Sequence, residues 1–475
     1  MADQRYKPNP QQQNKMAMSE NNKHRVNYFR FLTEKSKFRR PDAIEEYKHM
    51  QDGGDGNQLP AVSMVQGIPA TVNLPISHAS FTLQDGTPIY LDQSQMAVAQ
   101  TETSSYGYPP MVKFLEELQM TYHQPPQAAK GKEGNNLQIA MTTGSQAGLG
   151  KAFEMLLKPG DFVLVERPTN HRALTALRAL NARIIEVETD KFGIIPESLM
   201  YQMGRWHPAA AHSQHSDVAR VLYTMPTAAD PTGATITEQR KLEIYEICRK
   251  YNMLILEDDP NYFLQFSSVL TPSYLSLDVD GRVLRFDSFE NTMGPGYRLG
   301  WVTGHTTLVD KIVHHIQAAE QSPSAISQLV LYQILNTWGV SGYKAHTERV
   351  AELHKQKRDC MLLAADKYLR GMAEWSEPSG GMYLWIRINN IKDSRETIKD
   401  KGLKNNVLVV PGSVFLAFSD EQCAFVRASF SNLTPQEIDQ GIMFLSNLIK
   451  QETGYGLSNN QVNNFMGRAM KMEKF

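Results

Sequence analysis

A short turn of small polar residues is the first feature of this sequence that could do chemistry. Thr142-Thr143-Gly144-Ser145-Gln146-Ala147-Gly148 follows an apolar run at 137–141 and precedes a helical run at 147–157. The free backbone N–H groups and the dipole at the start of a helix favour an anion such as phosphate. Many strand-to-helix turns bind nothing, so this turn alone is a weak indication.

Three further polar motifs come directly after apolar runs. Asp230-Pro231-Thr232-Gly233 follows the run at 221–225, and Glu257-Asp258-Asp259-Pro260 ends another. Asp287-Ser288-Phe289 ends a third, with Pro295-Gly296-Tyr297-Arg298-Leu299-Gly300-Trp301 shortly after it. Ligands of open α/β sheets bind at the carboxyl ends of the strands, so we expect these motifs to meet in one pocket.

The elements that must position these motifs alternate between strand-length apolar runs and amphipathic helices. This alternation predicts an α/β fold with a mostly parallel sheet covered on both faces. After residue 311 the chain is helical to about residue 368, and the strands and the helix that follow predict a smaller α+β domain. The strands expected in the large domain are 137–141, 162–166, 183–187, 221–225, 254–257, 283–286 and 299–303.

Composition changes along the chain predict the domain boundaries. The polar ends of the chain lack the apolar residues that a packed core needs. The predicted parts are a disordered arm at 1–24, an N-terminal helix and arm of the small domain and dimer interface at 25–74, the large domain at 75–310, an interdomain helix at 311–339, the small C-terminal domain at 340–452 and a tail at 453–475.

In their order, these motifs resemble the fold-type I pyridoxal-phosphate (PLP) aminotransferases of class I and II. Within that family the chain is most similar to kynurenine/α-aminoadipate aminotransferases. The resemblance covers residues 26–450 and includes Tyr262-Phe263-Leu264-Gln265-Phe266 and Arg427-Ala428-Ser429-Phe430-Ser431. It implies the PLP-transferase fold type I, with a large domain, a small α+β domain and a homodimer whose active sites lie at the subunit interface.

Several positions match residues that hold the cofactor and the substrate in this family. The resemblance implies that Asp258 pairs with the pyridine nitrogen and that Arg427 binds the substrate α-carboxylate. A guanidinium suits a carboxylate because its planar fork donates two parallel hydrogen bonds. The phosphate is expected to lie against Ser145, Gln146, Ser288 and Arg298.

Other positions depart from the family pattern in the same pocket. Asn291 stands where the family has its Schiff-base lysine. Asp230 and Asn261 replace an asparagine and a tyrosine at the ring hydroxyl, Asn170 replaces the aromatic residue that stacks on the ring, and Glu102 replaces a tyrosine from the other subunit. The family's Gly-Gly-Leu-Pro becomes Gln66-Gly67-Ile68-Pro69.

These substitutions predict the loss of lysine-dependent transamination. The amide of Asn291 is neither nucleophilic nor basic, so it can neither form an imine nor move a proton. Carboxylates at Asp230, Glu290 and Glu102 would add negative charge beside an anionic cofactor. We therefore expect no covalently bound cofactor, with non-covalent PLP or pyridoxamine phosphate (PMP) as the less favoured alternative.

Three functions remain open from the residues alone. In the first, the pocket binds a small carboxylate through Arg427, of aromatic kynurenine-like or dicarboxylic amino-acid type. In the second, Asp230 or Glu290 is a catalytic base for new chemistry such as base-assisted oxidation, conceivably luminescent. In the third, the protein is a structural pseudoenzyme. Residual transaminase activity, or a trapped Lys-to-Asn variant, is a further alternative.

Overall composition narrows the classes of partner. The formal net charge of the 475 residues is −1, so no basic field favours nucleic acid. We expect no membrane partner, because no apolar run approaches the length of a membrane span. The three cysteines have no metal-ligand spacing, so we expect no metal site. A cytoplasmic location is the default expectation.

Overall fold

The computed structural model describes residues 26–44, 47, 64–65, 67, 69–128, 136–213, 216–418 and 420–455. The predicted arm at 1–24, most of the predicted tail, and Gln66 and Ile68 lie outside these residues. A large domain is built on one eight-stranded sheet with the order β3-β10-β9-β8-β7-β4-β5-β6. These strands are β3 (Leu137–Thr142), β4 (Phe162–Arg167), β5 (Arg183–Asp190), β6 (Gly193–Ile194), β7 (Val221–Thr224), β8 (Leu254–Asp258), β9 (Val283–Ser288) and β10 (Gly300–His305).

The sheet is mostly parallel, as predicted. The neighbours from β9 to β5 run parallel, whereas β10 is antiparallel to both β9 and β3, and β6 is antiparallel to β5. Every residue of β7, β8 and β9 is buried. Continuous apolar runs of this kind belong to strands that are covered on both faces.

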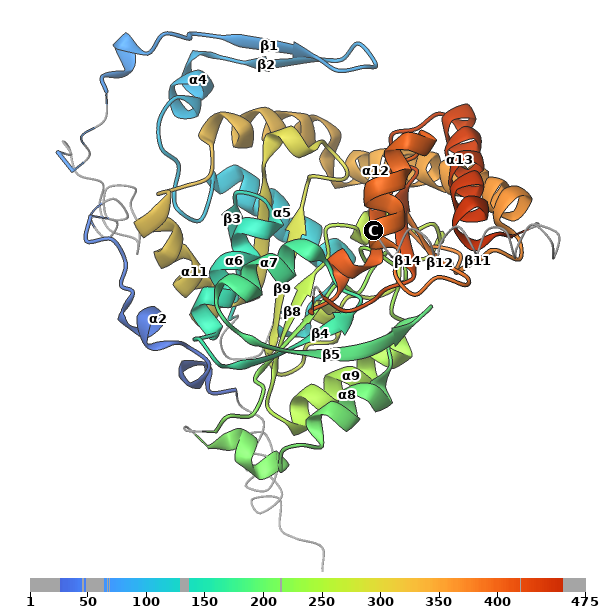
Figure 1. Cartoon of the computed structure of the whole chain (residues 1–475). Helices are drawn as coiled ribbons and strands as arrows, with labels where there is room; N and C mark the ends of the chain where they lie inside the picture. The colour runs from blue at the N-terminus through green and yellow to red at the C-terminus, as the bar shows by residue number, and fades with distance from the viewer. Residues whose placement is uncertain are drawn as a thin grey trace, which may run out of the picture.

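Helices cover the two faces and create two apolar cores (Figure 1). One face packs against α6 (Ser145–Leu156), α7 (His171–Ala179) and α11 (Thr306–Ala319). The other packs against α8 (Pro196–Met203), α9 (Glu238–Lys250) and α10 (Tyr274–Leu277).

The N-terminal segment packs on the large domain, not in the small domain as expected. Phe31 and Leu32 are buried in the same core as Phe153 of α6, and the backbone N–H of Thr33 donates to the carbonyl of Met155 at 2.8 Å. Burying these two apolar side chains removes them from water, which stabilises the packing of the N-terminal segment on the large domain. The segment holds η1 (Tyr28–Arg30) and the short helix α2 (Glu34–Phe38).

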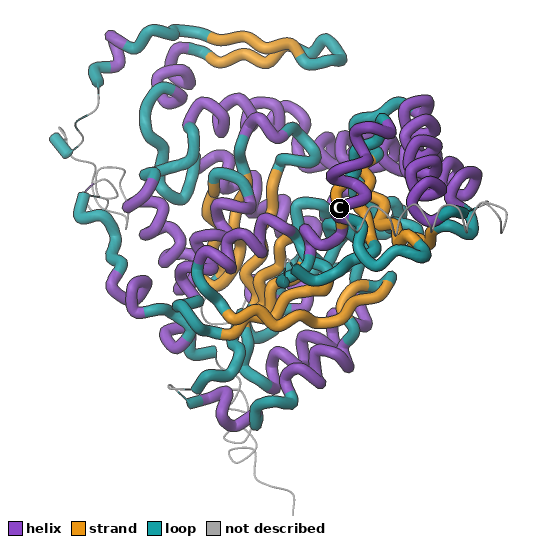
Figure 2. Tube along the Cα trace, in the orientation of Figure 1, coloured by secondary structure: helices purple, strands orange, loops and turns teal. Residues whose placement is uncertain are grey.

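A hairpin and two helices follow. The hairpin β1–β2 (Ala79–Thr82 and Pro88–Leu91) forms a separate ribbon at the edge of the molecule in Figure 2. Helices α4 (Gln93–Ala99) and α5 (Pro109–Tyr122) lead from it to the sheet. The other short helical turns are η3 (Thr71–Asn73), η4 (Pro126–Ala128), η5 (Pro208–His212), η6 (Tyr262–Leu264), η7 (Pro295–Tyr297), η8 (Thr397–Gly402), η9 (Leu403–Asn405) and η10 (Gly412–Phe415).

The small domain is an antiparallel sheet covered by helices. Its strand order is β11-β12-β14-β13, with β11 (Ala373–Trp375), β12 (Tyr383–Ile388), β13 (Val410–Pro411) and β14 (Phe425–Ser429). The helical run α12 (Ala325–Leu369) links the domains and changes direction at Gly339, whose φ of 63° is left-handed. The end of α12 and α13 (Pro435–Thr453) share an apolar core with the sheet. The domain boundaries drawn from the sequence stay predictions.

No described helix has the length and apolar character to cross a membrane. Among the same residues, no cluster of three His, Cys, Asp or Glu side chains has metal-binding geometry.

Candidate active site

A cavity of about 270 Å³ lies where the carboxyl ends of the large-domain strands face the small domain. It brings together nine of the residues singled out from the sequence. Ser288 and Arg298 lie next to it, whereas Glu102 is exposed and does not line it. The lining consists of Ser145, Gln146, Asn170, His171, Arg172, Met225, Asp230, Asp258, Pro260, Asn261, Glu290, Asn291, Met382, Tyr383 and Arg427.

Arg427 of β14 forms an ion pair with Asp230 from the loop after β7. The distance from Nη1 to Oδ1 is 2.6 Å, and the two side chains are only 14% and 8% exposed. Oδ2 of Asp230 accepts a hydrogen bond from Asn170 Nδ2 at 3.1 Å. The guanidinium also lies 4.1 Å from the ring centre of Tyr383 and 4.8 Å from that of Phe415. Arg427 is therefore held rigidly, with an internal carboxylate beside it.

Asn291 is held by a chain of amide hydrogen bonds. Its Nδ2 donates to Oδ1 of Asn261 at 2.7 Å, and Nδ2 of Asn261 donates to the carbonyl of Ala228 at 2.9 Å. Both side chains thus have polar partners within the cavity wall. Neither amide provides a base or a nucleophile.

Asp258 has one carboxylate oxygen that is bound and one that is not. Oδ2 accepts a hydrogen bond from the Tyr223 hydroxyl at 2.9 Å, whereas Oδ1 is buried without a hydrogen-bond partner. Burial raises the pKa of Asp258 to about 7, and the hydrogen bond from Tyr223 opposes that rise. A ligand N–H reaching Oδ1 would remove the cost of an unsatisfied buried acceptor.

The start of α6 and Arg298 form a tight corner at the other end of the cavity. Gly144, at φ 83°, precedes α6 without a side-chain cap, and a Cβ on it would lie 2.8 Å from Nη2 of Arg298. A Cβ on Gly300 would lie 2.7 Å from the backbone nitrogen of Ser145. Ser288 closes the corner, because its hydroxyl donates to the Leu299 carbonyl at 3.2 Å.

Glu290 is already paired with two arginines at this corner. Its Oε2 lies 3.2 Å from Nη1 of Arg298, and its Oε1 lies 3.4 Å from Nη1 of Arg172. Both carboxylates proposed as bases, Asp230 and Glu290, therefore bind guanidinium groups. Each pair places a cation, not a substrate, beside the carboxylate.

Sequence reasoning missed the buried ionic support beneath the site. Arg285 of β9 is completely buried and lies 2.8 Å from Asp259, 2.7 Å from Asp287 and 3.2 Å from Glu257. Burial raises the pKa of Asp287 to about 6, with Arg285 opposing the rise. The two-residue spacing between Arg285 and Asp287, which puts both on one face of a strand, is the signal that was available.

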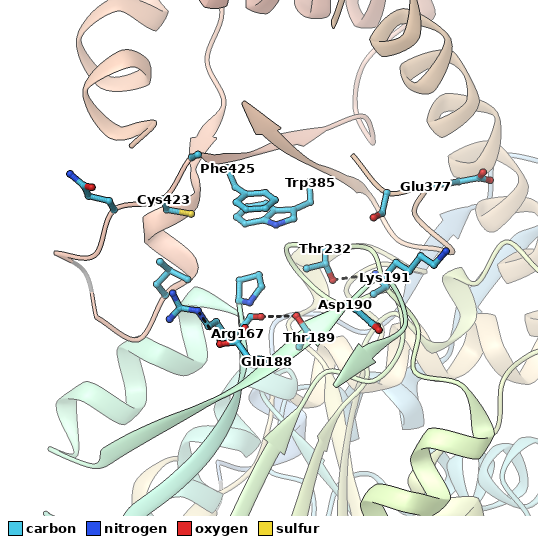
Figure 3. Close-up of a pocket in the computed structure, with 16 residues that line it drawn as sticks. Arg167, Glu188, Thr189, Asp190, Lys191, Thr232, Glu377, Trp385, Cys423 and Phe425 are labelled. Atoms are coloured by element: carbon cyan, nitrogen blue, oxygen red, sulfur yellow. Dashed lines mark hydrogen bonds and ion pairs between the residues drawn. The ribbon is translucent and has the colours of Figure 1, made fainter. Parts of the chain in front are cut away.

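A second cavity, of about 380 Å³, is lined in part by Trp385 and Phe425 of the small domain and by Glu188 and Thr189 of β5 (Figure 3). Trp385 and Phe425 stack in it with ring centres 5.1 Å apart. Trp385 also meets Phe415 edge-on at 5.6 Å, and Phe415 contacts Arg427. The second cavity shares no lining residue with the first.

Comparison with known proteins places this geometry in a family. The sequence model of the aminotransferase class I and II family matches residues 75–445. The chain belongs to the class I and II aminotransferases. It is 39% identical over 426 residues to the mitochondrial kynurenine/α-aminoadipate aminotransferase of Mus musculus, covering 90% of this chain and 100% of that protein. The Bos taurus protein of the same name is 37% identical over the same coverage.

Solved aminotransferases have the same fold. Aro8 from Candida albicans superimposes with a TM-score of 0.78 at 24% identity, over 89% of this chain and 98% of that chain. The kynurenine aminotransferase of Pyrococcus horikoshii gives 0.68 at 24% identity, over 90% and 98%. The cellular location of this class I and II aminotransferase homologue stays a prediction.

The family assignment corrects the prediction about the cofactor. Class I and II aminotransferases, including the kynurenine/α-aminoadipate enzymes, are PLP-dependent, so PLP is the expected cofactor and the expectation of none was wrong. That prediction assumed that the added carboxylates carry unpaired negative charges. In the structure Asp230 and Glu290 are each paired with arginine, so most of that repulsion is cancelled locally.

The residues present fit PLP at two of its three attachment points. The unsatisfied Oδ1 of Asp258 suits a protonated ring nitrogen, and the uncapped start of α6 beside Arg298 suits a phosphate. At the third point Asn291 offers an amide and no amine. No lysine is among the described residues that line this cavity.

Proposed function

We propose that this aminotransferase homologue binds an amino-acid-type carboxylate of kynurenine or aminoadipate kind in the PLP-type cavity, without lysine-dependent transamination. The observation that carries the proposal is the amide pair between Asn291 and Asn261, 2.7 Å apart, where the family's lysine would stand. Arg427 of the same cavity would bind the ligand carboxylate. The names of the mouse and cattle relatives supply the ligand class.

PLP would be held here by its ring nitrogen and its phosphate. Asp258 would accept the ring N–H, while Ser145, Gln146, Ser288 and Arg298 would surround the phosphate. When bound, PLP supplies an electron sink that stabilises negative charge at the substrate Cα. In this chain no lysine in the described cavity lining is placed to move a proton to or from that carbon.

Arg427 would bind the ligand carboxylate in competition with Asp230. Only Nη1 of the guanidinium is hydrogen-bonded to Asp230, and its other nitrogens form no hydrogen bond that the structure describes. A bidentate ligand carboxylate would share or displace Asp230. Tyr383 and Phe415 flank the guanidinium, so they favour a ligand with a flat or apolar side.

The geometry supports binding over the other two hypotheses. A cavity with an unsatisfied buried acceptor is not collapsed, as a purely structural relic would be. A carboxylate base for new chemistry would need to be free of its arginine partner, and neither Asp230 nor Glu290 is. The carboxylate-binding role uses the arginine, the acceptor and the cavity together.

Calorimetric titration with kynurenine and with α-aminoadipate tests this proposal. We expect the PLP-loaded wild-type protein to bind at least one of them, and Arg427→Ala to weaken that binding by more than about tenfold, since a charge-assisted hydrogen bond contributes about 1.5–3 kcal/mol. The matched control is Arg387→Ala, which removes an exposed arginine of β12 that pairs with Glu374. No wild-type binding, or equal affinities in wild type and Arg427→Ala, would refute the proposal.

A further inference from the structure

The second cavity, of about 380 Å³, is built by both domains and is hereafter the Trp385 cavity. The small domain contributes Trp385 of β12 and Phe425 of β14, and the large domain contributes Thr189 of β5 and Thr232 of the loop after β7. Figure 3 shows the two stacked rings on one side of the cavity and the two threonines on the other. The candidate active site uses none of these residues, so its proposed function leaves the Trp385 cavity unexplained.

The small-domain wall of the Trp385 cavity offers a flat apolar surface. The rings of Trp385 and Phe425 are only 9° from parallel. The buried side chains of Leu416 and Ala234 also line the cavity. Aromatic groups favour offset stacking, so a further planar ring can continue this stack. The volume lies in the range of small-molecule sites.

Two hydrogen-bond donors of the lining have no acceptor. Trp385 is 9% exposed, and its indole N–H has no partner among the described residues. Unlike the indole nitrogen of Trp301, that of Trp385 is not completely buried, and Figure 3 shows it on the side of the ring toward Thr232. The hydroxyl of Thr232 accepts from the backbone N–H of Ala234 at 3.2 Å, and its own hydrogen has no described acceptor. An indole nitrogen can only donate, so a ligand here must offer an acceptor.

The charged side chains of the lining do not favour a charged ligand. Four of them already form ion pairs with residues of opposite charge. These four are Arg167, Glu188, Asp190 and Glu377. The remaining charged residue of the lining, Lys191, is exposed to solvent. A charged ligand would lose its water without gaining a buried counter-charge, so an uncharged ligand is favoured.

We propose that the Trp385 cavity binds an uncharged, planar heteroaromatic molecule that carries hydrogen-bond acceptors at its edge. The ligand ring continues the stack of Trp385 and Phe425. The indole N–H and the Thr232 hydroxyl donate to its carbonyl or ring-nitrogen acceptors. Because each domain supplies one wall, the bound molecule also stabilises the folded arrangement of the two domains.

Calorimetric titration of the full-length protein with 4-quinolone, a planar ring with a carbonyl acceptor, tests the site. We expect the wild type to bind it. Trp385→Phe keeps a ring but removes the donor and should weaken binding at least about threefold, and Trp385→Leu should weaken it more than about tenfold. The matched control is Trp375→Phe, in β11 and outside both cavities. Arg427→Ala should leave the binding in place, which separates this site from the candidate active site.

Three outcomes of the titration would overturn the proposal. One is the absence of wild-type binding, and another is an affinity that Trp385→Leu leaves unchanged. Equal affinities of wild type and Trp385→Phe would contradict the hydrogen bond and with it the ligand class. In the Arg427→Ala background, tighter binding of quinoline-4-carboxylate than of 4-quinolone would contradict the preference for an uncharged ligand.

Fluorine NMR of the wild-type sequence labelled with fluorotryptophan keeps the test valid if the Trp385 variants fold poorly. The chain has five tryptophans, and none is among the described residues that line the candidate active site. Replacing the other tryptophans one at a time with phenylalanine assigns the Trp385 resonance. We expect 4-quinolone to shift this resonance and to leave that of Trp375 in place. Binding that saturates without moving the Trp385 resonance would place the ligand elsewhere and refute the assignment.

Discussion

Nη1 of Arg427 lies 2.6 Å from Oδ1 of Asp230, so the small domain's key cation is bound to a carboxylate of the large domain. Under the proposed function, this pair occupies the position at which a ligand carboxylate would bind Arg427. Glu290 is likewise paired with Arg298 and Arg172, so two of the carboxylates added to the cavity are locally balanced.

Replacing Asp230 with asparagine should tighten ligand binding. Asp230→Asn removes the internal competitor for Arg427 and keeps an oxygen that can accept from Asn170. We expect the affinity for kynurenine or α-aminoadipate to rise at least about fivefold in calorimetric titration. Asp366→Asn, an exposed acid of α12, is the control. Weaker binding in Asp230→Asn would mean that the carboxylate itself contacts the ligand.

Restoring lysine at position 291 should restore the covalent link but not efficient transamination. After incubation with PLP and reduction with borohydride, the mass spectrum should show a modified residue 291 in Asn291→Lys and none there in wild type. Further change of Asp230→Asn, Asn261→Tyr and Asn170→Tyr in that background should raise the rate more than about tenfold, because these residues position the ring. A single revertant as active as the combined variant would contradict this account.

Protein stability should fall as the pH rises through the neutral range. Burial raises the pKa of Glu166 to about 8 from an ordinary 4.5, so the folded state holds a proton that the unfolded state has released. The stabilisation by protonated Glu166 is complete below pH 4.5 and is lost as the pH rises to about 8. Glu166→Gln should remove a pH-dependent loss on the order of 5 kcal/mol, measured by denaturant unfolding at several pH values. A pH profile unchanged by Glu166→Gln would contradict the buried, protonated state.

Removing Arg285 should destabilise the large domain strongly. Arg285→Met would leave Glu257, Asp259 and Asp287 buried without their counter-charge. Breaking a buried ionic group in this way typically costs about 3–5 kcal/mol. Thermal unfolding of Arg285→Met, with Arg249→Met as the control for a more exposed ion pair, measures this cost. A small change would show that water or protonation compensates the three acids.

The strands of the large domain were predictable because their signal is local. Each of the seven predicted runs became a strand, with ends that differ by at most three residues from β3, β4, β5, β7, β8, β9 and β10. Continuous apolar runs between helices leave few alternatives for the backbone. The hairpin β1–β2 was not predicted, because each strand has only four residues and β1 is largely exposed.

The sequence by itself determined the residue types of the site and their places at strand ends. Asn291 cannot form a Schiff base in any surroundings, because its amide nitrogen is not nucleophilic. The family also followed from the order of residues, whereas the cofactor prediction made from the charges of the same residues was wrong, because the family is PLP-dependent.

Only the tertiary structure decided which charges meet. Arg427 and Asp230 are 197 positions apart, and packing of β14 against the large domain brings them together. Folding also brings Glu290 to Arg172. It likewise leaves Oδ1 of Asp258 and the guanidinium of Arg30 buried without a hydrogen-bond partner. Electrostatic energy depends on distance and burial, which the folded chain sets and a residue's place in the sequence does not.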